Sequence, residues 1–128
     1  MAKTILVADD ETEIQEMLKE MLTETGYQVV TADDGKDALR KVQLAKPDLI
    51  ILDINMPKMD GAQVSLALKQ NEATKNIPLI FLTGLRTRDD GFSIEKDVGG
   101  IPTFAKPFDY TELLGKIREL IAESEKKK

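Results

Sequence analysis

The sequence of 128 residues contains no histidine, no cysteine and no tryptophan. Without cysteine the chain forms no disulfide and has no thiol nucleophile, and without histidine it has no imidazole base. The usual nitrogen and sulfur ligands of zinc are missing for the same reason. Any chemistry of this chain must therefore use carboxylates, hydroxyl groups, lysine or the backbone.

Positive charge is also in short supply, because 18 Lys and Arg residues face 23 Asp and Glu residues, for a net charge of -5. A nucleic-acid groove needs clustered basic side chains to neutralise phosphates. The basic run at residues 126–128 is typical of a solvated helix end, and no apolar stretch is long enough for a signal peptide or a membrane span. We expect one cytoplasmic domain over residues 1–128, with no membrane insertion and no direct contact with nucleic acid.

Short apolar runs alternate with helical patterns along the chain. Strands are expected over residues 4–8, 28–32, 48–52, 79–82 and 103–105. Helices are expected over residues 11–25, 36–45 and 61–71 and, behind an Asp109-to-Glu112 spacing that resembles a capping box, over the last segment. The clearest helix carries an apolar stripe at helical spacing, formed by Ile14, Met17, Leu18, Met21 and Leu22. Residues 85–100, with three glycines, predict only a short or loosely held helix.

Nearly continuous apolar strands that alternate with helices predict a doubly wound α/β domain, with a parallel sheet covered on both faces. In such sheets ligands bind beyond the C-terminal ends of the strands. Asp9 and Asp10 follow the first expected strand, Asp53 the third, Thr83 the fourth and Lys106 the fifth. Three clustered carboxylates repel one another, so their convergence favours a bound cation, and hard oxygen ligands suit Mg²⁺. A hydroxyl and an ammonium beside them would complete a cradle for phosphate.

At this point the residues resemble the receiver domains of two-component response regulators, over essentially the whole chain. The matching pieces, in order, are residues 5–11 (ILVADDE), 52–61 (LDINMPKMDG), 81–84 (FLTG) and 105–108 (AKPF). Each piece alone is modest, whereas their order and intervals together are highly specific. The resemblance implies a five-stranded parallel sheet in the flavodoxin-like order 2-1-3-4-5. It also suggests a cis peptide bond between Lys106 and Pro107, which proline permits.

The resemblance further implies the roles of the site residues. Asp53 would be the phosphoacceptor, and Mg²⁺ would be bound by Asp10, Asp53 and the backbone carbonyl of Asn55, with assistance from Asp9. Thr83 and Lys106 would engage the phosphoryl group. The chain would then be a signalling switch rather than an enzyme on other substrates, and its donor would be a phosphohistidine of a sensor kinase or histidine phosphotransfer protein, since it has no histidine of its own. Phosphorylation would shift the face from the fourth strand to the last helix and so control an unknown protein partner.

The sequence departs from the family pattern near its end. Three positions before Lys106, where the family usually has an aromatic side chain that changes rotamer, this chain has Thr103, and the aromatic Phe104 follows one place later. Either the rotamer switch is missing, or a bulge shifts the register of the strand.

Simpler interpretations stay open for single residues. Asp10 could be the N-cap of the first helix, Asp53 a turn residue, Thr83 an ordinary strand residue and Lys106 a surface side chain. Asp60 and Gly61 favour turn and helix-start roles over a ligand role.

Two other classes of function remain alternatives. An aspartate-nucleophile phosphohydrolase would have a second acid two positions after the nucleophile, where this chain has Asn55, an amide that cannot exchange protons as a carboxylate does. A flavodoxin-like mononucleotide-binding module would have a phosphate loop rich in glycine or hydroxyl groups after the first strand, where this chain has acids.

Overall fold

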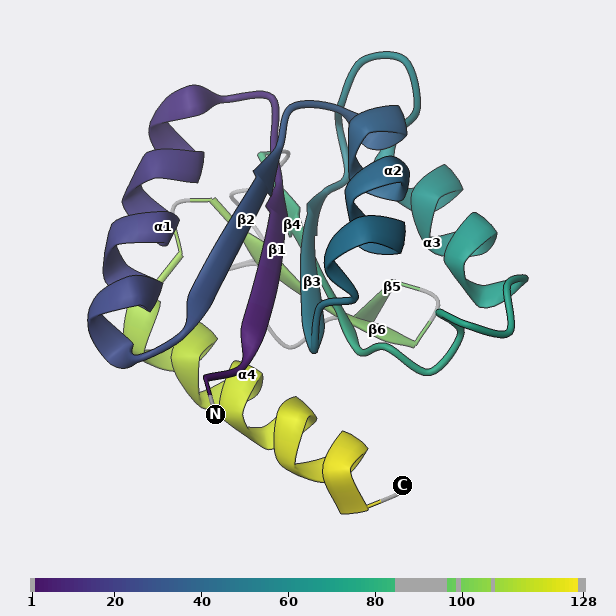
Figure 1. Ribbon diagram of the computed structural model, residues 1–128. Coiled ribbons are helices and arrows are strands. Elements are labelled where there is room, and N and C mark those ends of the chain that lie inside the picture. The colour runs from purple at the N-terminus through teal and green to yellow at the C-terminus, as the bar shows by residue number, and fades with distance from the viewer. Residues whose placement is uncertain (1, 85–96, 99, 107, 127–128) are drawn as a thin grey trace.

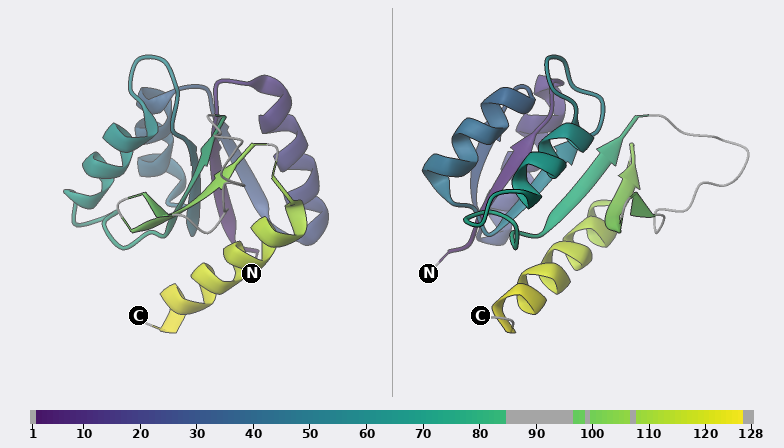
Figure 2. Two further views of the ribbon diagram at one scale, coloured as in Figure 1. Left: turned by 180° about the vertical axis from the view of Figure 1, so that it is seen from behind. Right: turned by 90° about the vertical axis from the view of Figure 1, so that its right-hand side faces the viewer.

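The computed structural model describes residues 2–84, 97–98, 100–106 and 108–126. Its core is a sheet of five parallel strands: β1 (Thr4–Ala8), β2 (Gln28–Ala32), β3 (Leu49–Asp53), β4 (Leu79–Thr83) and β6 (Ile101–Ala105). They lie in the order β2-β1-β3-β4-β6, and a short β5 (Asp97–Val98) pairs antiparallel with the outer side of β6. With the five parallel strands counted along the chain, this is the expected order 2-1-3-4-5, extended by one short edge strand. Figure 2, seen from behind, brings β5 and β6 to the front, at the opposite end of the sheet from β2.

Helices cover both faces of the sheet, as the doubly wound prediction requires (Figure 1). The described helices are α1 (Thr12–Thr25), α2 (Gly35–Ala45), α3 (Gly61–Lys69) and α4 (Tyr110–Lys126). Two apolar clusters fill the layers: one joins α2 and α3 to one face through residues such as Val42, Val64 and Phe81, and the other joins α1 and α4 to the opposite face. None of the described helices combines the length and the apolar character needed to cross a bilayer.

Helix α1 buries a face slightly different from the predicted one. Its buried residues are Gln15, Leu18 and Leu22, whereas Met17 is 36% exposed. The stripe prediction was thus wrong for Met17, because the centre of the buried face lies along Gln15 and Leu18. The polar residue Gln15 is the buried position of α1 nearest the C-terminal ends of the strands.

The segment after β4 differs most from expectation. Only a short or loosely held helix was expected within residues 85–100; residues 85–96 and 99 lie outside the described residues, and at the end of this segment Asp97 and Val98 form a strand. Val98 pairs with Ile101, and Gly100 between them has φ +82, a left-handed conformation that glycine adopts without strain. The chain therefore reverses here in a tight hairpin. Pro107, and with it the suggested cis peptide bond, also lies outside the described residues.

Candidate functional site

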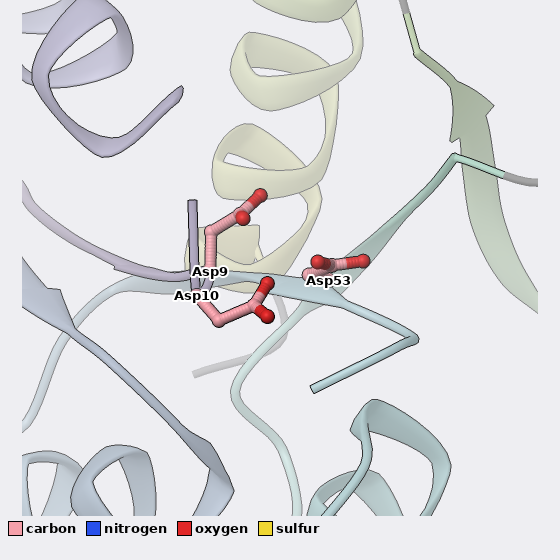
Figure 3. A group of neighbouring side chains, drawn as sticks. All are labelled: Asp9, Asp10 and Asp53. Carbon is pink, nitrogen blue, oxygen red and sulfur yellow. The ribbon is translucent and has the colours of Figure 1, made fainter. Parts of the chain in front are cut away.

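Three carboxylates gather where β1 and β3 end. These strands are neighbours, with Ala8 opposite Leu52, so Asp9 and Asp10 emerge beside Asp53. One oxygen from each of the three acids lies within 4.8 Å of the others, and Figure 3 shows the side chains together above the two strand ends. Asp9 is 0% and Asp53 3% exposed, whereas Asp10 is exposed. The parallel register thus produces the acid cluster that the sequence predicts.

Lys106, from the end of β6, places its ammonium in this cluster. Its Nζ lies 2.9 Å from Asp9 Oδ2 and 3.3 Å from Asp53 Oδ2. On the solvent side it lies 2.8 Å from Oε1 of Glu11. The lysine side chain is only 12% exposed. Lys106 is therefore a buried counter-ion of the acids and not a surface lysine, as the simpler interpretation had it.

Backbone N–H groups orient the two buried carboxylates. Asp9 Oδ1 accepts a hydrogen bond from the Glu11 N–H at 2.8 Å, and Asp53 Oδ1 accepts one from the Asn55 N–H at 3.1 Å. Asp9 Oδ2 forms an ion pair with Lys106 at 2.9 Å, and no other described group contacts this buried oxygen as a donor. Buried polar atoms normally have a donor or a cation as partner. Asp9 Oδ2 thus has the Lys106 ammonium as its single partner among the described groups.

The pKa shifts of the cluster also show that its negative charge is not fully compensated. Burial raises the pKa of Asp53 to about 6, and the nearby Asp9 carboxylate adds to the rise, against the opposing effect of Lys106. Burial also raises the pKa of Asp9. Burial alone would lower the pKa of Lys106, but Glu11, Asp9 and Asp53 outweigh it and raise that pKa. One lysine therefore does not fully compensate the acids, and an added cation would stabilise their charged forms.

Thr83 closes β4 next to this cluster. It is 7% exposed, and its carbonyl accepts a hydrogen bond from the Lys106 N–H at 2.8 Å. In the adjoining ladder Asp53 stands opposite Leu82, the residue before Thr83. The strand ends of β3, β4 and β6 are thus held together by backbone contacts, and they bring Asp53, Thr83 and Lys106 to one edge of the sheet.

The loop after Asp53 leads directly into helix α3, and its last residues form the N-terminus of that helix. Asp60 is the N-cap of α3 and forms a capping box with Gln63, which supports the turn interpretation of this residue. At Gly61 a Cβ atom would lie 2.7 Å from the carbonyl oxygen of Asp53, so only glycine lets the loop pack against the strand end. Asp10, by contrast, is not a helix cap: the N-cap residue of α1 is Glu11, and its side chain makes no capping hydrogen bond. The capping interpretation of Asp10 was therefore wrong.

Sequence reasoning missed two residues near the site, Glu11 and Gln15. Glu11 makes the shortest contact of the Lys106 ammonium. Gln15 is 7% exposed, and its Nε2 lies within hydrogen-bond distance of oxygens of Asp9, Ala32 and Asp33. The signal for Gln15 was available, because a polar residue one position after Ile14 and three before Leu18 shares the buried face of the helix.

Thr103 replaces the expected aromatic without any shift in register. The β4–β6 ladder runs regularly from Phe81 opposite Thr103 to Thr83 opposite Ala105, so the bulge alternative was wrong. Thr103 is 2% exposed, and its hydroxyl donates to the Ile101 carbonyl at 3.0 Å. Phe104 packs in the opposite core cluster with α1 and α4. In this structure, no aromatic side chain occupies the position from which the family's rotamer change operates.

Comparison with known proteins identifies the family. Residues 5–118 match the response regulator receiver domain. The chain belongs to this family. Receiver domains are signalling switches of two-component systems; they bind Mg²⁺ at an acidic pocket and interact with histidine kinases and downstream targets. The family match supports the receiver interpretation over the aspartate-nucleophile phosphohydrolase.

Individual relatives agree with this assignment. The alkaline phosphatase synthesis transcriptional regulatory protein PhoP of Bacillus subtilis is 37% identical over 127 residues, which are 98% of this chain and 51% of PhoP. This receiver domain thus spans about half the length of that relative. A CheY-like receiver domain protein from Methanospirillum hungatei has a TM-score of 0.84 at 28% identity, with 100% of both chains covered. The response regulator TrrA of Thermotoga maritima, solved in complex with Mg²⁺ and BeF, has a TM-score of 0.76 at 36% identity, with 92% of this chain and 98% of that chain covered.

Proposed function

We propose that this receiver domain, formed by residues 1–128, takes up a phosphoryl group on Asp53 in a Mg²⁺-dependent step. The observation that carries the proposal is the set of oxygens of Asp9, Asp10 and Asp53 within 4.8 Å of one another, with Lys106 against two of them. Asp53 is a nearly buried carboxylate at the end of β3, where Lys106 contacts its Oδ2 and the Asn55 N–H contacts its Oδ1, and a carboxylate so placed can act as a nucleophile.

The donor set fits Mg²⁺. Asp10, Asp53 and the backbone carbonyl of Asn55 would hold the ion, with Asp9 in direct or water-mediated contact. Oxygen ligands suit this hard cation, and the buried Asp9 Oδ2 has no partner among the described groups other than the Lys106 ammonium. When bound, Mg²⁺ would neutralise the acids and polarise an oxygen of the phosphoryl group.

The chain's own residues divide the remaining work. An Asp53 carboxylate oxygen attacks the phosphorus of a phosphohistidine in line with the bond to nitrogen; the new P–O bond forms as the P–N bond breaks, and the imidazole leaves with the electron pair. Lys106, released from its ion pairs, donates to an oxygen of the phosphoryl group and balances its charge. The Thr83 hydroxyl, on the adjoining strand, donates to another.

The phosphohistidine is that of a cytoplasmic sensor kinase or histidine phosphotransfer protein, because residues 1–128 contain no histidine. This receiver domain then catalyses its own phosphorylation and its slow dephosphorylation. The new dianion biases an equilibrium between two arrangements of the face from β4 to α4, and a protein partner binds one of them.

Incubation with acetyl phosphate and Mg²⁺ tests the proposal. Intact-mass and peptide analysis should find one phosphoryl group on Asp53, and omission of Mg²⁺ or the substitution Asp53→Asn should abolish it. Asp60→Asn is the matched control, because it alters a nearby acid that caps α3 and should leave labelling unchanged. Labelling of Asp53→Asn at the normal rate would overturn the assignment. Rapid turnover of many phosphoesters would favour a hydrolase instead, and uptake of flavin a mononucleotide-binding module.

A further inference from the structure

The buried amide of Gln15 joins three parts of the chain. Its Nε2 lies 2.5 Å from the carbonyl oxygen of Asp9, 3.1 Å from that of Ala32 and 2.9 Å from Oδ1 of Asp33. These oxygens belong to the turn after β1, the end of β2 and the turn that leads to α2. All three are acceptors, so the NH₂ end of the amide faces them, and its two hydrogens are shared among the three oxygens.

A backbone hydrogen bond also reaches the Ala32 carbonyl. The Asp9 N–H donates to the Ala32 carbonyl at 3.1 Å, while the Asp9 C=O accepts from Gln15, which also donates to Ala32; Asp9 is thus held to β2 directly through its N–H and indirectly through Gln15. The Asp9 backbone, from which the Asp9 and Asp10 side chains reach the acid cluster, is therefore fixed by Gln15, whose own side chain is not part of the cluster. Since Gln15 is 7% exposed, water cannot readily replace its donors.

We propose that Gln15 is a positioning residue for Mg²⁺: it fixes the backbone of Asp9 against β2 and so sets the placement of the Asp9 and Asp10 carboxylates. This inference rests on the proposed function and extends it to a residue outside the ligand set. Mg²⁺ requires nearly ideal octahedral geometry, and so its affinity is sensitive to small displacements of its ligands. Partners that orient metal ligands affect metal affinity by about 10- to 100-fold when they are lost.

The test is the dissociation constant of Mg²⁺, measured from amide chemical shifts of ¹⁵N-labelled protein without a phosphodonor. Gln15→Met keeps the length of the side chain but removes its donors, and we expect it to weaken Mg²⁺ binding by roughly tenfold. Gln15→Asn keeps an amide that is one methylene too short to reach all three acceptors, so its constant should lie between those of Gln15→Met and the unmodified chain. It also provides a second measurement if Gln15→Met does not fold.

Leu22→Val is the matched control. Leu22 is a fully buried residue of the same helix, two turns away from the acids, and its loss of packing lowers stability without touching the turn after β1. Mg²⁺ binding by this variant should stay within about twofold of the unmodified chain, because its ligands keep their supports. Weakening by Gln15→Met but not by Leu22→Val supports the positioning role.

Equal affinity in Gln15→Met and the unmodified chain, or equal weakening by Leu22→Val, would overturn it. The proposed function fails separately: in that case the unmodified chain binds no Mg²⁺, or Asp53→Asn binds it unchanged.

Discussion

The ammonium of Lys106 lies 3.3 Å from the Asp53 carboxylate, although the two residues are 53 positions apart in the chain. The contact joins the end of β6 to the end of β3 across β4. Besides the role proposed for it in phosphoryl transfer, this lysine compensates the charge of the buried Asp9 and Asp53 carboxylates in the resting protein.

Lys106→Met should therefore lower the free energy of unfolding in metal-free buffer at neutral pH by about 3 kcal/mol, because removal of one partner leaves buried charges unpaired. Added Mg²⁺ should stabilise this variant more than the unmodified chain, since the ion would no longer compete with the lysine. Urea denaturation with and without Mg²⁺ measures both effects. Lys75→Met, which removes an exposed ion pair with Glu72, should change stability by no more than about 0.5 kcal/mol. Similar losses in the two variants would contradict the role of Lys106 as a buried counter-ion.

Stability of the metal-free protein should depend on pH through Asp53. Its pKa is about 6 in the folded chain against an ordinary value of 3.8, so between these values the folded chain binds more protons than the unfolded chain. The free energy of unfolding contributed by this group therefore falls as pH rises through that window. Asp53→Asn should remove that part of the slope and raise stability at pH 7.5 by about 1–3 kcal/mol. Denaturant titrations in EDTA from pH 4 to 8 measure it.

Asp37 provides the control of opposite sign. Burial alone would raise its pKa, but hydrogen bonds from Arg40, the Asp33 N–H and Lys41 outweigh burial and lower it. Asp37 thus contributes stability at neutral pH that is lost in acid, and Asp37→Asn should destabilise the protein at pH 7.5. If Asp53→Asn lowers stability at pH 7.5 as Asp37→Asn does, the charge environment inferred for Asp53 is wrong.

Gly35→Ala should destabilise the fold by about 1–3 kcal/mol or more, because a Cβ atom at this position would lie 2.1 Å from the Met59 carbonyl oxygen. Gly35 opens α2, and Met59 precedes α3, so the clash would push these two helix starts apart. Thermal or urea unfolding measures the loss. In Gly115→Ala the new Cβ meets no atom within 4 Å inside α4, and this variant should gain about 0.5–1 kcal/mol. A neutral Gly35→Ala would show that the two loops can separate freely.

Lys58→Gly should stabilise the protein by about 0.5–1 kcal/mol, because Lys58 has φ +68 and a non-glycine residue in this conformation is strained. The substitution also removes an exposed ion pair with Asp34 at 3.6 Å, which is worth little. Lys69→Gly, inside the last turn of α3, is the comparison and should cost about 1 kcal/mol. Chemical denaturation of the two variants should give opposite signs; a loss in both would mean that the loop of Lys58 is not strained.

Much of this fold follows from patterns within short segments. Apolar runs predict β1 to β4 to within a residue or two because both faces of the central strands are buried, and the strand order came from the family resemblance. The strand-end acids could be foreseen since parallel strands present their ends at one edge. In contrast, the two-residue β5 has too few residues for a periodic signal, and it depends on the reversal at Gly100.

The candidate site shows the same division. Asp9, Asp10 and Asp53 carry their own chemical signature, whereas Glu11 and Gln15 gain their contacts only when distant segments meet. Glu11 reads as an ordinary exposed acid until Lys106 arrives from 95 positions away. The expected apolar stripe of α1 was wrong for Met17 alone, because apolar character placed the helix face without allowance for a buried amide with three acceptors.

The antiparallel pair at the end of the sheet has a consequence for how copies of this protein meet. Beyond the parallel ladder, β6 carries Pro102, which has no N–H group, and β5 covers it with only two residues. An edge so short gives an approaching strand few backbone groups to pair with, and thus protects against edge-to-edge aggregation. At the opposite end the five-residue β2 is the edge strand of the described sheet, paired on one side only. Lateral growth of the sheet, if it is forced by high concentration, should therefore begin at β2.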